Sequence, residues 1–428
     1  FKAYPHEISG GQKQRVMIAM AIACKPKLLI ADEPTTALDV TVQKEIVLLL
    51  KELQKETGMS ILFISHDLSL VSEIADRVIV MYKGKIVERG SSASIFKNPQ
   101  EDYTKALIYA RPSTTERLEK LPTVADFLKG TPPSSPVSTA TRTKQHQEIY
   151  AKTPLLEIKN AQKEYYAKVS FFGKTETVKA VNDVSFKIYE GETLGLVGES
   201  GCGKSTLGNL ILQLDKATSG HIFYKGKDLT QLKTRELRKL RRDIQIIFQD
   251  PYSSLNPRMT IGNAIMEPMQ VHKILENDKQ RKKRVEELLA KVSLDPSHFY
   301  RYPHEFSGGQ RQRIGIARAL AVNPKFIICD ESVSALDVSV QAQVLNLLNE
   351  LKEEFGLTYI FISHDLSVVK YMSDRMLVMQ DGKIEEMGDA DQIYNEPETE
   401  YTKKLIDAIP EGKLEDIKKH LESKGVKV

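Results

Sequence analysis

The sequence contains few of the residues that hold small extracellular domains together. Its 428 residues include 3 cysteines and no tryptophan. Cys24, Cys202 and Cys329 form no Cys-x-x-Cys pair and stand apart from the histidines. This spacing excludes a disulfide framework and predicts no zinc site.

Long apolar runs and an excess of one charge sign are also missing. Apolar runs such as residues 46–50 are far shorter than the ~20 residues that span a bilayer. The 61 basic and 57 acidic residues leave a net charge of +4, so no nucleic-acid partner is expected. The most basic stretch, 233–242, could face nucleic acid, but Leu237 and Leu240 have helical spacing, which favours a solvated helix face. Without a charged and apolar leader after Phe1, we expect a cytosolic fragment.

One part of the sequence occurs twice. Ser9 and Ser307 differ by 298 positions, and a long, gap-free stretch keeps this offset. It relates these pairs: Ser9 and Ser307, Gly10 and Gly308, Gly11 and Gly309, Gln12 and Gln310, Asp32 and Asp330, His66 and His364, Tyr103 and Tyr401. A constant period indicates a duplicated module. A phosphate-type glycine loop occurs only once, so the first copy is expected to lack its front half.

The repeat divides the chain into four parts, which we name module one (1–111), the linker (112–153), module two (154–410) and the tail (411–428). The linker has little apolar periodicity, and residues 130–136 are rich in proline, serine and threonine. We therefore expect a linker that does not pack. The tail is expected to be an exposed amphipathic helix or an irregular end.

Module two shows the pattern of an α/β fold. An apolar strand over 193–197 precedes the glycine loop, which is followed by a predicted helix over 205–214. Two further predicted strands, 325–329 and 358–362, end in polar residues. Polar groups at the ends of parallel strands mark the ligand edge of such a sheet. Between the loop and the second of these strands, residues 260–292 predict a mainly helical insertion.

The glycine loop predicts a phosphate site. Its glycines allow backbone N–H groups to point at phosphate oxygens, and the following helix adds its positive N-terminal dipole. Lys204 is expected to contact the β and γ phosphates, and the Ser205 hydroxyl to ligate Mg²⁺. The loop comprises Gly198, Glu199, Ser200, Gly201, Cys202, Gly203, Lys204, Ser205 and Thr206.

Five further residues are candidates for this site. Asp330 is expected to hold Mg²⁺, and Glu331 to act as the general base on the attacking water; the alternative is an acidic helix cap. Gln249 is a candidate ligand of Mg²⁺ and that water. His364 could donate to the γ phosphate or be structural. Tyr165 could stack on adenine or be an ordinary surface tyrosine.

These motifs resemble those of the ATP-binding cassette (ABC) ATPases. The resemblance implies a P-loop NTPase fold, with a RecA-like core and a helical subdomain, present as one full copy plus the C-terminal half of another. In module two, it assigns the Walker A motif to 198–206, the Q-loop to Gln249, the signature to 306–310, Walker B to 326–331, the D-loop to Asp337 and the switch histidine to His364. In module one, it assigns the signature to 8–12, Walker B to 28–33 with Asp32 and Glu33, the D-loop to Asp39 and the switch histidine to His66.

Within that superfamily, residues 248–259 are similar to the dipeptide, oligopeptide and nickel importers. Segments 99–107 and 397–405, each with Tyr-Thr-Lys before an apolar helix, support this. Ser332 departs from the usual proline, which module one has as Pro34. The linker lacks the cysteine cluster of some relatives, so no iron–sulfur cluster is predicted.

The resemblance implies an ATPase subunit at the cytoplasmic face of a bacterial inner membrane. Its partners would be two transmembrane permease subunits and, through them, an extracytoplasmic substrate-binding protein. Peptides, glutathione and nickel remain possible cargoes. A soluble twin-cassette ATPase acting on ribosomes or DNA is the alternative. Missing zinc-type cysteine pairs and the proline-rich linker argue against it.

Members of this family pair head to tail, so each ATP site takes residues from both modules. The site on Lys204 would be completed by Ser9, Gly10, Gly11, Gln12 and Asp39 of module one. The opposite site would combine Asp32, Glu33 and His66 with Ser307, Gly308, Gly309 and Gln310. Signature N–H groups at a helix N-terminus would stabilise γ-phosphate charge across the interface.

Overall fold

A computed structural model describes most of the chain. The described residues are 4, 8–36, 38–113, 116–131, 134–168, 175–250, 252–334 and 336–409. The tail predicted over 411–428 lies outside them. Among the described residues, no helix combines the length and apolar character needed to cross a bilayer.

A six-stranded sheet forms the centre of module two. Its strands run in the order β10-β11-β12-β7-β13-β14, parallel except for β14 at the edge. Their bounds are β7 Thr193–Val197, β10 Ile244–Ile247, β11 Phe326–Asp330, β12 Thr358–Ile362, β13 Arg375–Gln380 and β14 Lys383–Asp389. Every residue of β7 and β12 is buried, as expected for parallel strands that are covered on both faces. The α/β class and the three predicted strands are confirmed.

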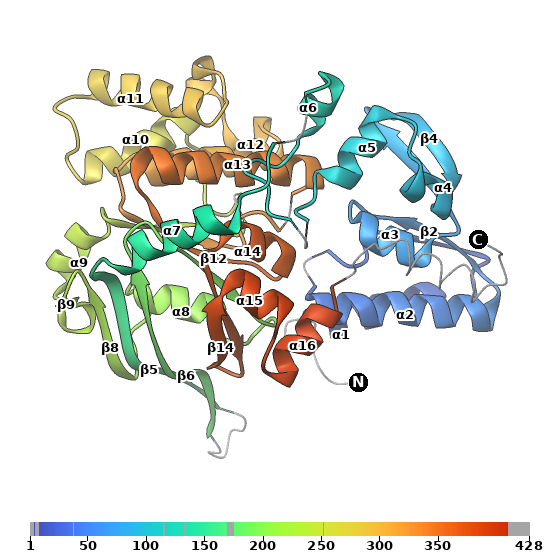
Figure 1. Cartoon of the computed structure of the whole chain (residues 1–428), viewed down its shortest axis with the longest axis horizontal. Helices are drawn as coiled ribbons and strands as arrows, with labels where there is room; N and C mark the ends of the chain where they lie inside the picture. Colours follow the sequence, from blue (N-terminus) through green and yellow to red (C-terminus); the bar gives the residue numbers. More distant parts are fainter. Residues whose placement is uncertain are drawn as a thin grey trace.

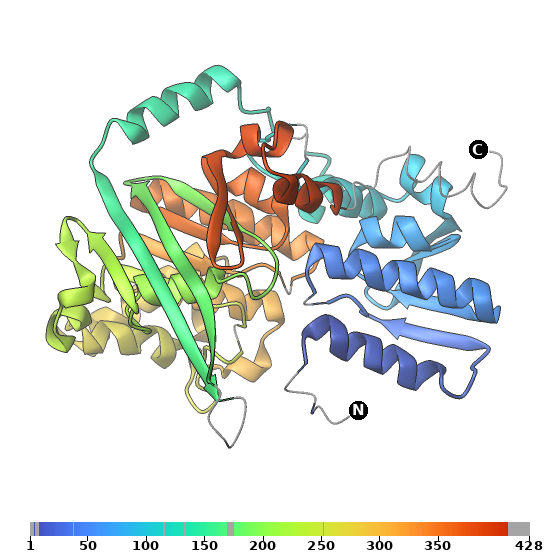
Figure 2. The ribbon, with the colours of Figure 1, turned by 90° about the horizontal axis from the view of Figure 1, so that it is seen from below.

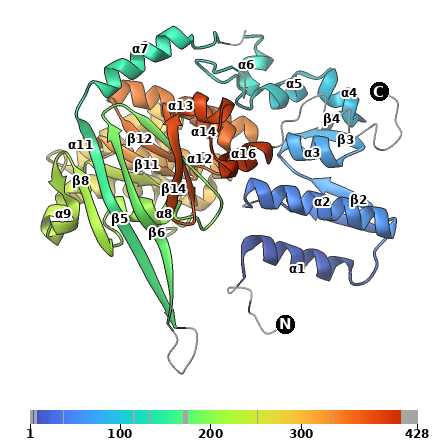
Figure 3. The ribbon, with the colours of Figure 1, turned by 60° about the horizontal axis from the view of Figure 1, so that its bottom comes forward.

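An antiparallel sheet and a set of helices cover this centre. The second sheet has the order β6-β5-β8-β9, and its two long strands extend along one side of the molecule (Figure 3). Its strands are β5 Pro154–Lys168, β6 Thr175–Tyr189, β8 Ser219–Tyr224 and β9 Lys227–Asp228. The helices are α8 Lys204–Ile211, α9 Thr234–Leu240, α10 Ile261–Val271, α11 Asp278–Lys291, α12 Gly308–Leu320, α13 Val338–Phe355, α14 Leu366–Met372, α15 Ala390–Asn395 and α16 Glu400–Asp407, with short 3-10 turns at Leu229–Gln231, Pro296–Tyr300 and Pro303–Glu305. Helices α10 and α11 form the predicted insertion, and α9 buries no residue, as expected for a solvated helix.

Module one repeats the second half of module two and lies beside it (Figure 1). Its elements are α1 Gly10–Ile22, β1 Leu28–Asp32, α2 Val40–Thr57, β2 Ser60–Ile64, α3 Leu68–Ile74, β3 Arg77–Tyr82, β4 Lys85–Ser91, α4 Ser92–Lys97 and α5 Asp102–Tyr109. Each begins 298 positions before its counterpart in module two, from α1 and α12 to α5 and α16. The predicted duplication is therefore present in the structure.

The strands of module one form two separate pairs. Strand β1 pairs with β2 and β3 with β4, whereas in module two β7 lies between the equivalent strands β12 and β13. Side chains of β1 and β3 are accordingly exposed, with Leu28 at 54% and Ile79 at 53%, while the equivalent Phe326 and Leu377 are fully buried. Module one thus presents apolar strand faces that module two covers with β7, α8 and the second sheet.

The linker packs on module two, which contradicts the expectation that it would not pack. It contains α6 Val124–Leu128 and α7 Thr139–Tyr150, and α7 runs along the outside of module two toward β5 (Figure 2). Leu121 is buried, and its backbone N–H donates to Asn346 Oδ1 at 2.9 Å while its carbonyl accepts from Asn346 Nδ2 at 2.8 Å. In the proline-rich stretch itself, the Ser134 hydroxyl accepts from the Lys120 N–H at 2.9 Å and donates to the Lys120 carbonyl at 2.7 Å, so this composition did not prevent ordered contacts.

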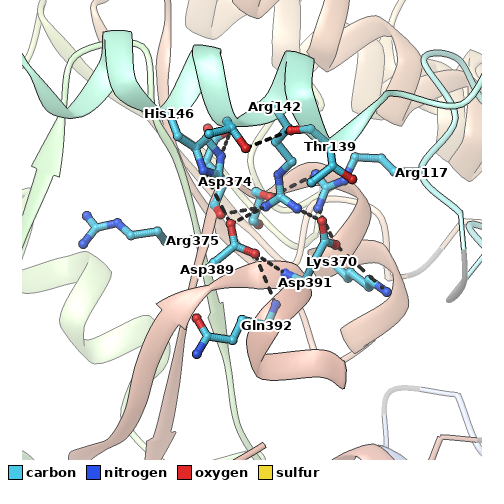
Figure 4. A network of polar contacts seen from close by, with 12 residues as sticks. Arg117, Thr139, Arg142, His146, Lys370, Asp374, Arg375, Asp389, Asp391 and Gln392 are labelled. Carbon is cyan, nitrogen blue, oxygen red and sulfur yellow. Dashed lines mark hydrogen bonds and ion pairs between the residues drawn. The ribbon is translucent and has the colours of Figure 1, made fainter. Parts of the chain in front are cut away.

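Charged side chains on one stripe of α7 make most of its contacts (Figure 4). The Arg142 guanidinium donates to the Asp374 carbonyl at 2.9 Å and pairs with Asp389 at 3.2 Å and with Asp391. His146, one turn later, lies 3.5 Å from Asp374 and 3.4 Å from Asp389. No residue of α7 is fully buried. At the end of the helix, the Tyr150 ring packs edge-on against Tyr189 with 5.3 Å between the ring centroids. Charged contacts and this aromatic contact together hold α7 in place.

Candidate functional site

The glycine loop joins β7 to α8 at the carboxyl edge of the main sheet. Gly198 and Gly203 have φ of 145° and 108°, and a Cβ on either would meet a backbone oxygen at 2.2 or 2.1 Å. Only glycine fits this path, because the chain passes so close to its neighbours. The buried Lys204 ammonium donates to the carbonyls of Gly198 at 2.7 Å and Glu199 at 2.9 Å. Its positive charge therefore lies inside the loop, as phosphate binding requires.

Oxygen ligands suited to a hard cation meet beside the loop. The Ser205 hydroxyl donates to Asp330 Oδ1 at 3.2 Å, since α8 and β11 bring them to the same sheet edge. Burial raises the pKa of the Asp330 carboxyl above its ordinary value, against the lowering effects of Ser205 and Lys204. A hydroxyl and a carboxylate are oxygen donors of the kind that Mg²⁺ prefers, and the amide group of Gln249 lies beside the neighbouring Glu331. The residues present fit the predicted cation.

Glu331 lies at the centre of a polar contact network. Gln249 Nε2 donates to Glu331 Oε2 at 2.7 Å, and His364 Nδ1 lies 3.7 Å from the same oxygen. Burial alone would raise the pKa of Glu331, but His364 and Lys204 hold it below its ordinary value. The carboxylate is therefore ionised at neutral pH, which a general base requires.

Glu331 and its equivalent in module one, Glu33, have an unusual backbone conformation. Glu331 has φ of 46° and Glu33 has φ of 48°, a left-handed region that non-glycine residues seldom occupy. In module one, His66 Nδ1 lies 2.9 Å from Glu33 Oε1, and the His66 backbone N–H donates to the same oxygen at 3.1 Å. Strain of this kind concentrates at functional sites. In both modules, this conformation accompanies a contact between the glutamate carboxylate and the histidine ring.

The half-buried His364 imidazole has a pKa above its ordinary value. Burial would lower its pKa, but the contact with Glu331 and the negative charges of Asp365 and Asp39 raise it. The protonated ring persists at a higher pH than in a free histidine and can donate to an anion. His364 is thus placed as a donor beside the predicted base.

Module one reaches into the loop of module two. The Ser200 backbone N–H donates to Asp39 Oδ1 at 2.7 Å, and the Thr41 hydroxyl donates to Glu199 Oε1 at 3.0 Å. Both module-one residues lie at the start of α2, whose N-terminal end points toward module two (Figure 3). The Asp39 carboxylate thus contacts the loop that carries Lys204. Thr41 was missed, because an isolated threonine carries no motif.

Residues 9–12, which the resemblance assigns to a signature, lie at the N-terminus of α1, and this end of the helix faces module two (Figure 3). Among the described residues, no hydrogen bond joins Ser9, Gly10, Gly11 or Gln12 to the glycine loop. The Ser9 hydroxyl accepts from the Gln12 N–H at 3.3 Å, and the Gln12 side chain accepts from the Ser9 N–H at 3.1 Å. This reciprocal cap satisfies the Gln12 N–H, whereas the N–H groups of Gly10 and Gly11, at the first two helical positions, have no intrahelical acceptor.

One glycine of each signature has a packing role that sequence reasoning missed. A Cβ on Gly309 would meet the Val340 side chain at 2.3 Å, and a Cβ on Gly11 would meet Val42 at 2.6 Å. The second glycine lets α12 contact α13, and α1 contact α2. In the opposite site, Ser307 and Gln310 form the same reciprocal cap on α12. Asp337 precedes α13, as Asp39 precedes α2.

Two tyrosines lie near the loop. Tyr165, on β5, donates to Asp215 Oδ2 at 3.0 Å and keeps 41% of its surface exposed, so its ring can be reached from solvent. The Tyr401 hydroxyl accepts from the Glu199 backbone N–H at 3.1 Å. The sequence shows Tyr401 as a repeat of Tyr103, but nothing in its spacing indicates contact with the loop.

These features define a P-loop nucleotide-binding protein, with an acidic pair at the sheet edge and a second module facing the loop. The family model described as "ABC transporter" matches residues 1–36 and 181–334. A model described as "Oligopeptide/dipeptide transporter, C-terminal region" matches residues 87–134 and 386–425. Each model therefore matches once in each repeat.

Solved structures and curated proteins give the same assignment. The chain is 34% identical to the ATP-binding cassette MJ0796 in a dimeric post-hydrolysis structure bound to ADP and Pi; the match covers 98% of that chain and 55% of this one, with a TM-score of 0.50. The chain belongs to the ATP-binding cassettes of ABC transporters.

Two relatives are named glutathione import ATP-binding protein GsiA. The protein from Pectobacterium atrosepticum is 49% identical over 409 residues, and that from Escherichia coli O6:H1 is 50% identical over 416 residues. Each match covers 95% of this chain and 65% of the relative. The chain thus spans about two thirds of the length of these relatives.

Proposed function

We propose that this chain belongs to the ATP-hydrolysing, energy-coupling subunit of a bacterial importer for peptides or related small solutes. The observation that carries the proposal is the Lys204 loop, with Glu331 beside it and Asp39 of module one bound to its backbone. The two matches to the oligopeptide/dipeptide transporter region support the peptide-type assignment. The GsiA relatives make glutathione the first cargo to test.

The residues of the site divide the hydrolytic work. Lys204 and the loop N–H groups would hold the β and γ phosphates, and Ser205, Asp330 and Gln249 would hold Mg²⁺, which would neutralise phosphate charge. Glu331 accepts a proton from the water that attacks the γ phosphorus. The bond from that phosphorus to the β-phosphate oxygen breaks, giving ADP and inorganic phosphate.

Residues around this centre complete the proposed site. His364 donates to the γ-phosphate oxygens. Module one contributes Asp39 and the N-terminus of α1, with Ser9 and Gln12, which stabilise charge across the interface. Tyr165 is proposed to stack on the adenine ring, because it is 41% exposed and its strand β5 pairs with β6, whose Ala180 carbonyl lies beside Gly203 of the loop. In the opposite site, Asp32, Glu33 and His66 would pair with the N-terminus of α12.

Energy coupling is proposed to act through domain closure. Nucleotide held between the modules closes them, and hydrolysis releases them. The partners that would use this motion are two membrane permease subunits and, through them, an extracytoplasmic substrate-binding protein. The subunit itself would lie at the cytoplasmic face of the inner membrane as a peripheral protein.

We also propose that module one is the C-terminal part of a first cassette and module two a second, complete cassette. Two observations support this: the separated strand pairs of module one, and the exposed Leu28 and Ile79 where module two buries their equivalents. A segment equivalent to β7, α8 and the second sheet would cover these faces. The four-part division at residues 111, 153 and 410 follows from this proposal.

ATP hydrolysis by the purified chain tests the core of the proposal. We expect MgATP turnover in the wild type, loss of nucleotide binding in Lys204→Ala, and retained binding without turnover in Glu331→Gln. Equal turnover in wild type and Glu331→Gln would reject the base assignment. Affinity purification from cells tests the partners: capture of ribosomes or DNA without any membrane protein would contradict the importer assignment.

A further inference from the structure

One arginine joins equivalent positions of the two modules. Arg111 Nη1 lies 3.3 Å from Asp67 Oδ1 of module one, and Arg111 Nη2 lies 3.7 Å from Asp365 Oδ2 of module two. The offset of the repeat relates the two carboxylates, since Asp67 follows His66 directly and Asp365 follows His364. A single guanidinium therefore links the residues next to both switch histidines.

Each of these carboxylates also fixes the start of a helix. Asp67 Oδ1 accepts from the Ser69 N–H at 2.9 Å at the beginning of α3, and Asp365 Oδ1 accepts from the Ser367 N–H at 2.9 Å at the beginning of α14. An N-cap bond of this kind sets the backbone of the capping residue relative to its helix. The position of each carboxylate therefore influences the histidine that precedes it.

The backbone on both sides of Arg111 is packed. Its backbone neighbours Ala110 and Pro112 are buried, and about a quarter of the guanidinium side chain remains exposed. The side chain lines a cavity of about 230 Å³ between the modules, together with both switch histidines. Burial alone would raise the pKa of Asp365, but the charge of Arg111 and the contact with Ser367 keep it below its ordinary value. Both charges of the pair are thus present at neutral pH.

The arrangement is asymmetric. The offset that relates the modules carries Arg111 to Ile409, an apolar residue that lines the same cavity. One arginine therefore contacts both carboxylates. A displacement of α3 would move Asp67, and the Arg111 side chain would transmit that movement to Asp365 at the start of α14.

We propose that Arg111 is a positioning residue for ATP hydrolysis, which couples the two switch histidines by holding Asp67 and Asp365 together. A change at one site that moves Asp67 moves the guanidinium, then Asp365 and His364, and with it the donor that faces Glu331. This inference rests on the proposed ATPase function for its kinetic consequence, but its structural consequence can be tested without turnover.

Kinetics of Arg111→Met separate positioning from binding. We expect the Kd for MgATP to stay within 3-fold of wild type while kcat at the Lys204 site falls at least 10-fold, because small displacements of positioned groups reduce rates strongly. Lys105→Met is the control: it removes a positive charge of module one that pairs with Asp102 at 3.1 Å within α5, and kcat should stay within 2-fold. Arg111→Lys keeps the positive charge but lacks the two Nη groups that contact the two carboxylates. Its kcat should therefore lie between those of Arg111→Met and the wild type. An unchanged kcat in Arg111→Met would overturn the proposal.

A double-mutant cycle tests the coupling directly. Asp67→Asn lies in module one, yet we expect it to lower kcat at the Lys204 site when Arg111 is present and to have no further effect in Arg111→Met. Additive effects of the two substitutions would overturn the proposal, because they would show that Asp67 and Arg111 act independently.

Histidine NMR separates this inference from the proposed function. In protein labelled on the imidazole ring and assigned with His364→Gln, Asp67→Asn should shift the His364 resonance in the wild-type background and leave it unmoved in Arg111→Met. An unmoved His364 resonance in Asp67→Asn overturns the coupling, whether or not the chain hydrolyses ATP. Absent hydrolysis by the folded wild type, with the His364 shift present, would instead reject the proposed ATPase function alone.

Discussion

Substitution of Arg142 by methionine should detach α7 from module two. The guanidinium is 11% exposed and contacts the Asp374 carbonyl at 2.9 Å, Asp389 at 3.2 Å, and Asp391. Removing one partner of a fully buried ion pair costs about 3–5 kcal/mol. Here the carboxylates of Asp389 and Asp391 are each 34% exposed, so water can reach them. Asp391 also retains its ion pair with Arg117 at 3.1 Å. We therefore expect a loss of about 2 kcal/mol.

Thermal unfolding measures this loss. For a domain the size of module two, a loss of about 2 kcal/mol lowers the Tm by about 4–8 °C. Near-UV circular dichroism can follow this unfolding transition. Limited proteolysis should cut Arg142→Met between residues 116 and 153 under conditions that leave the wild type intact. Lys144→Met, on the exposed side of the same helix, is the control and should match the wild type in both assays. Equal Tm values for Arg142→Met and Lys144→Met would refute the conclusion that charge holds the linker in place.

Three other substitutions have defined outcomes. Glu331→Gln removes the main contact that raises the pKa of His364, so NMR titration should show a lower His364 pKa. In the wild type, protonated His364 stabilises the fold fully below pH 6.5, and this stability is lost as the pH rises through the raised pKa. In Glu331→Gln the same loss should occur at a lower pH. An unchanged pKa would show that the contact does not set it. Asp39→Ala removes a charge-assisted bond to the loop, worth about 1.5–3 kcal/mol; we expect nucleotide affinity to fall at least 10-fold in an equilibrium fluorescence assay, and equal affinity would contradict a shared site. Gly309→Ala should lower stability by about 1–3 kcal/mol through overpacking, measured by thermal melts, whereas Gly308→Ala, with no atom within 4 Å of its new Cβ, should not.

Much of the nucleotide site could be predicted from the sequence because its chemistry depends on local order. A strand, a glycine loop and a helix must follow one another for Lys204 to enter the loop, and that order is visible along the chain. Asp330 and His364 could be placed because polar residues that end parallel strands share one edge of the sheet. The contact between Asp39 and the loop required a further step, the resemblance to paired cassettes.

The rest depended on contacts that leave no periodic pattern. Helix α7 uses Arg142 and His146, one turn apart on a polar helix, so a search for apolar periodicity passes over it. The left-handed backbone of Glu331 and Glu33 is a property of the folded strand end, since glutamate itself does not favour it. Arg111 resembles any surface arginine until the structure brings two equivalent aspartates to it.

The anchored linker changes how the Lys204 site assembles. Ala110 already belongs to the core of module two, and Arg117 bonds the carbonyls of Tyr371 and Ser373, so little chain separates α5 from its first attachment. A tether this short keeps the two modules at an effective concentration of the order of millimolar. Their encounter is therefore unimolecular. Dilution of the protein should leave the fraction of assembled sites unchanged, whereas dilution would lower that fraction for cassettes carried on separate polypeptides.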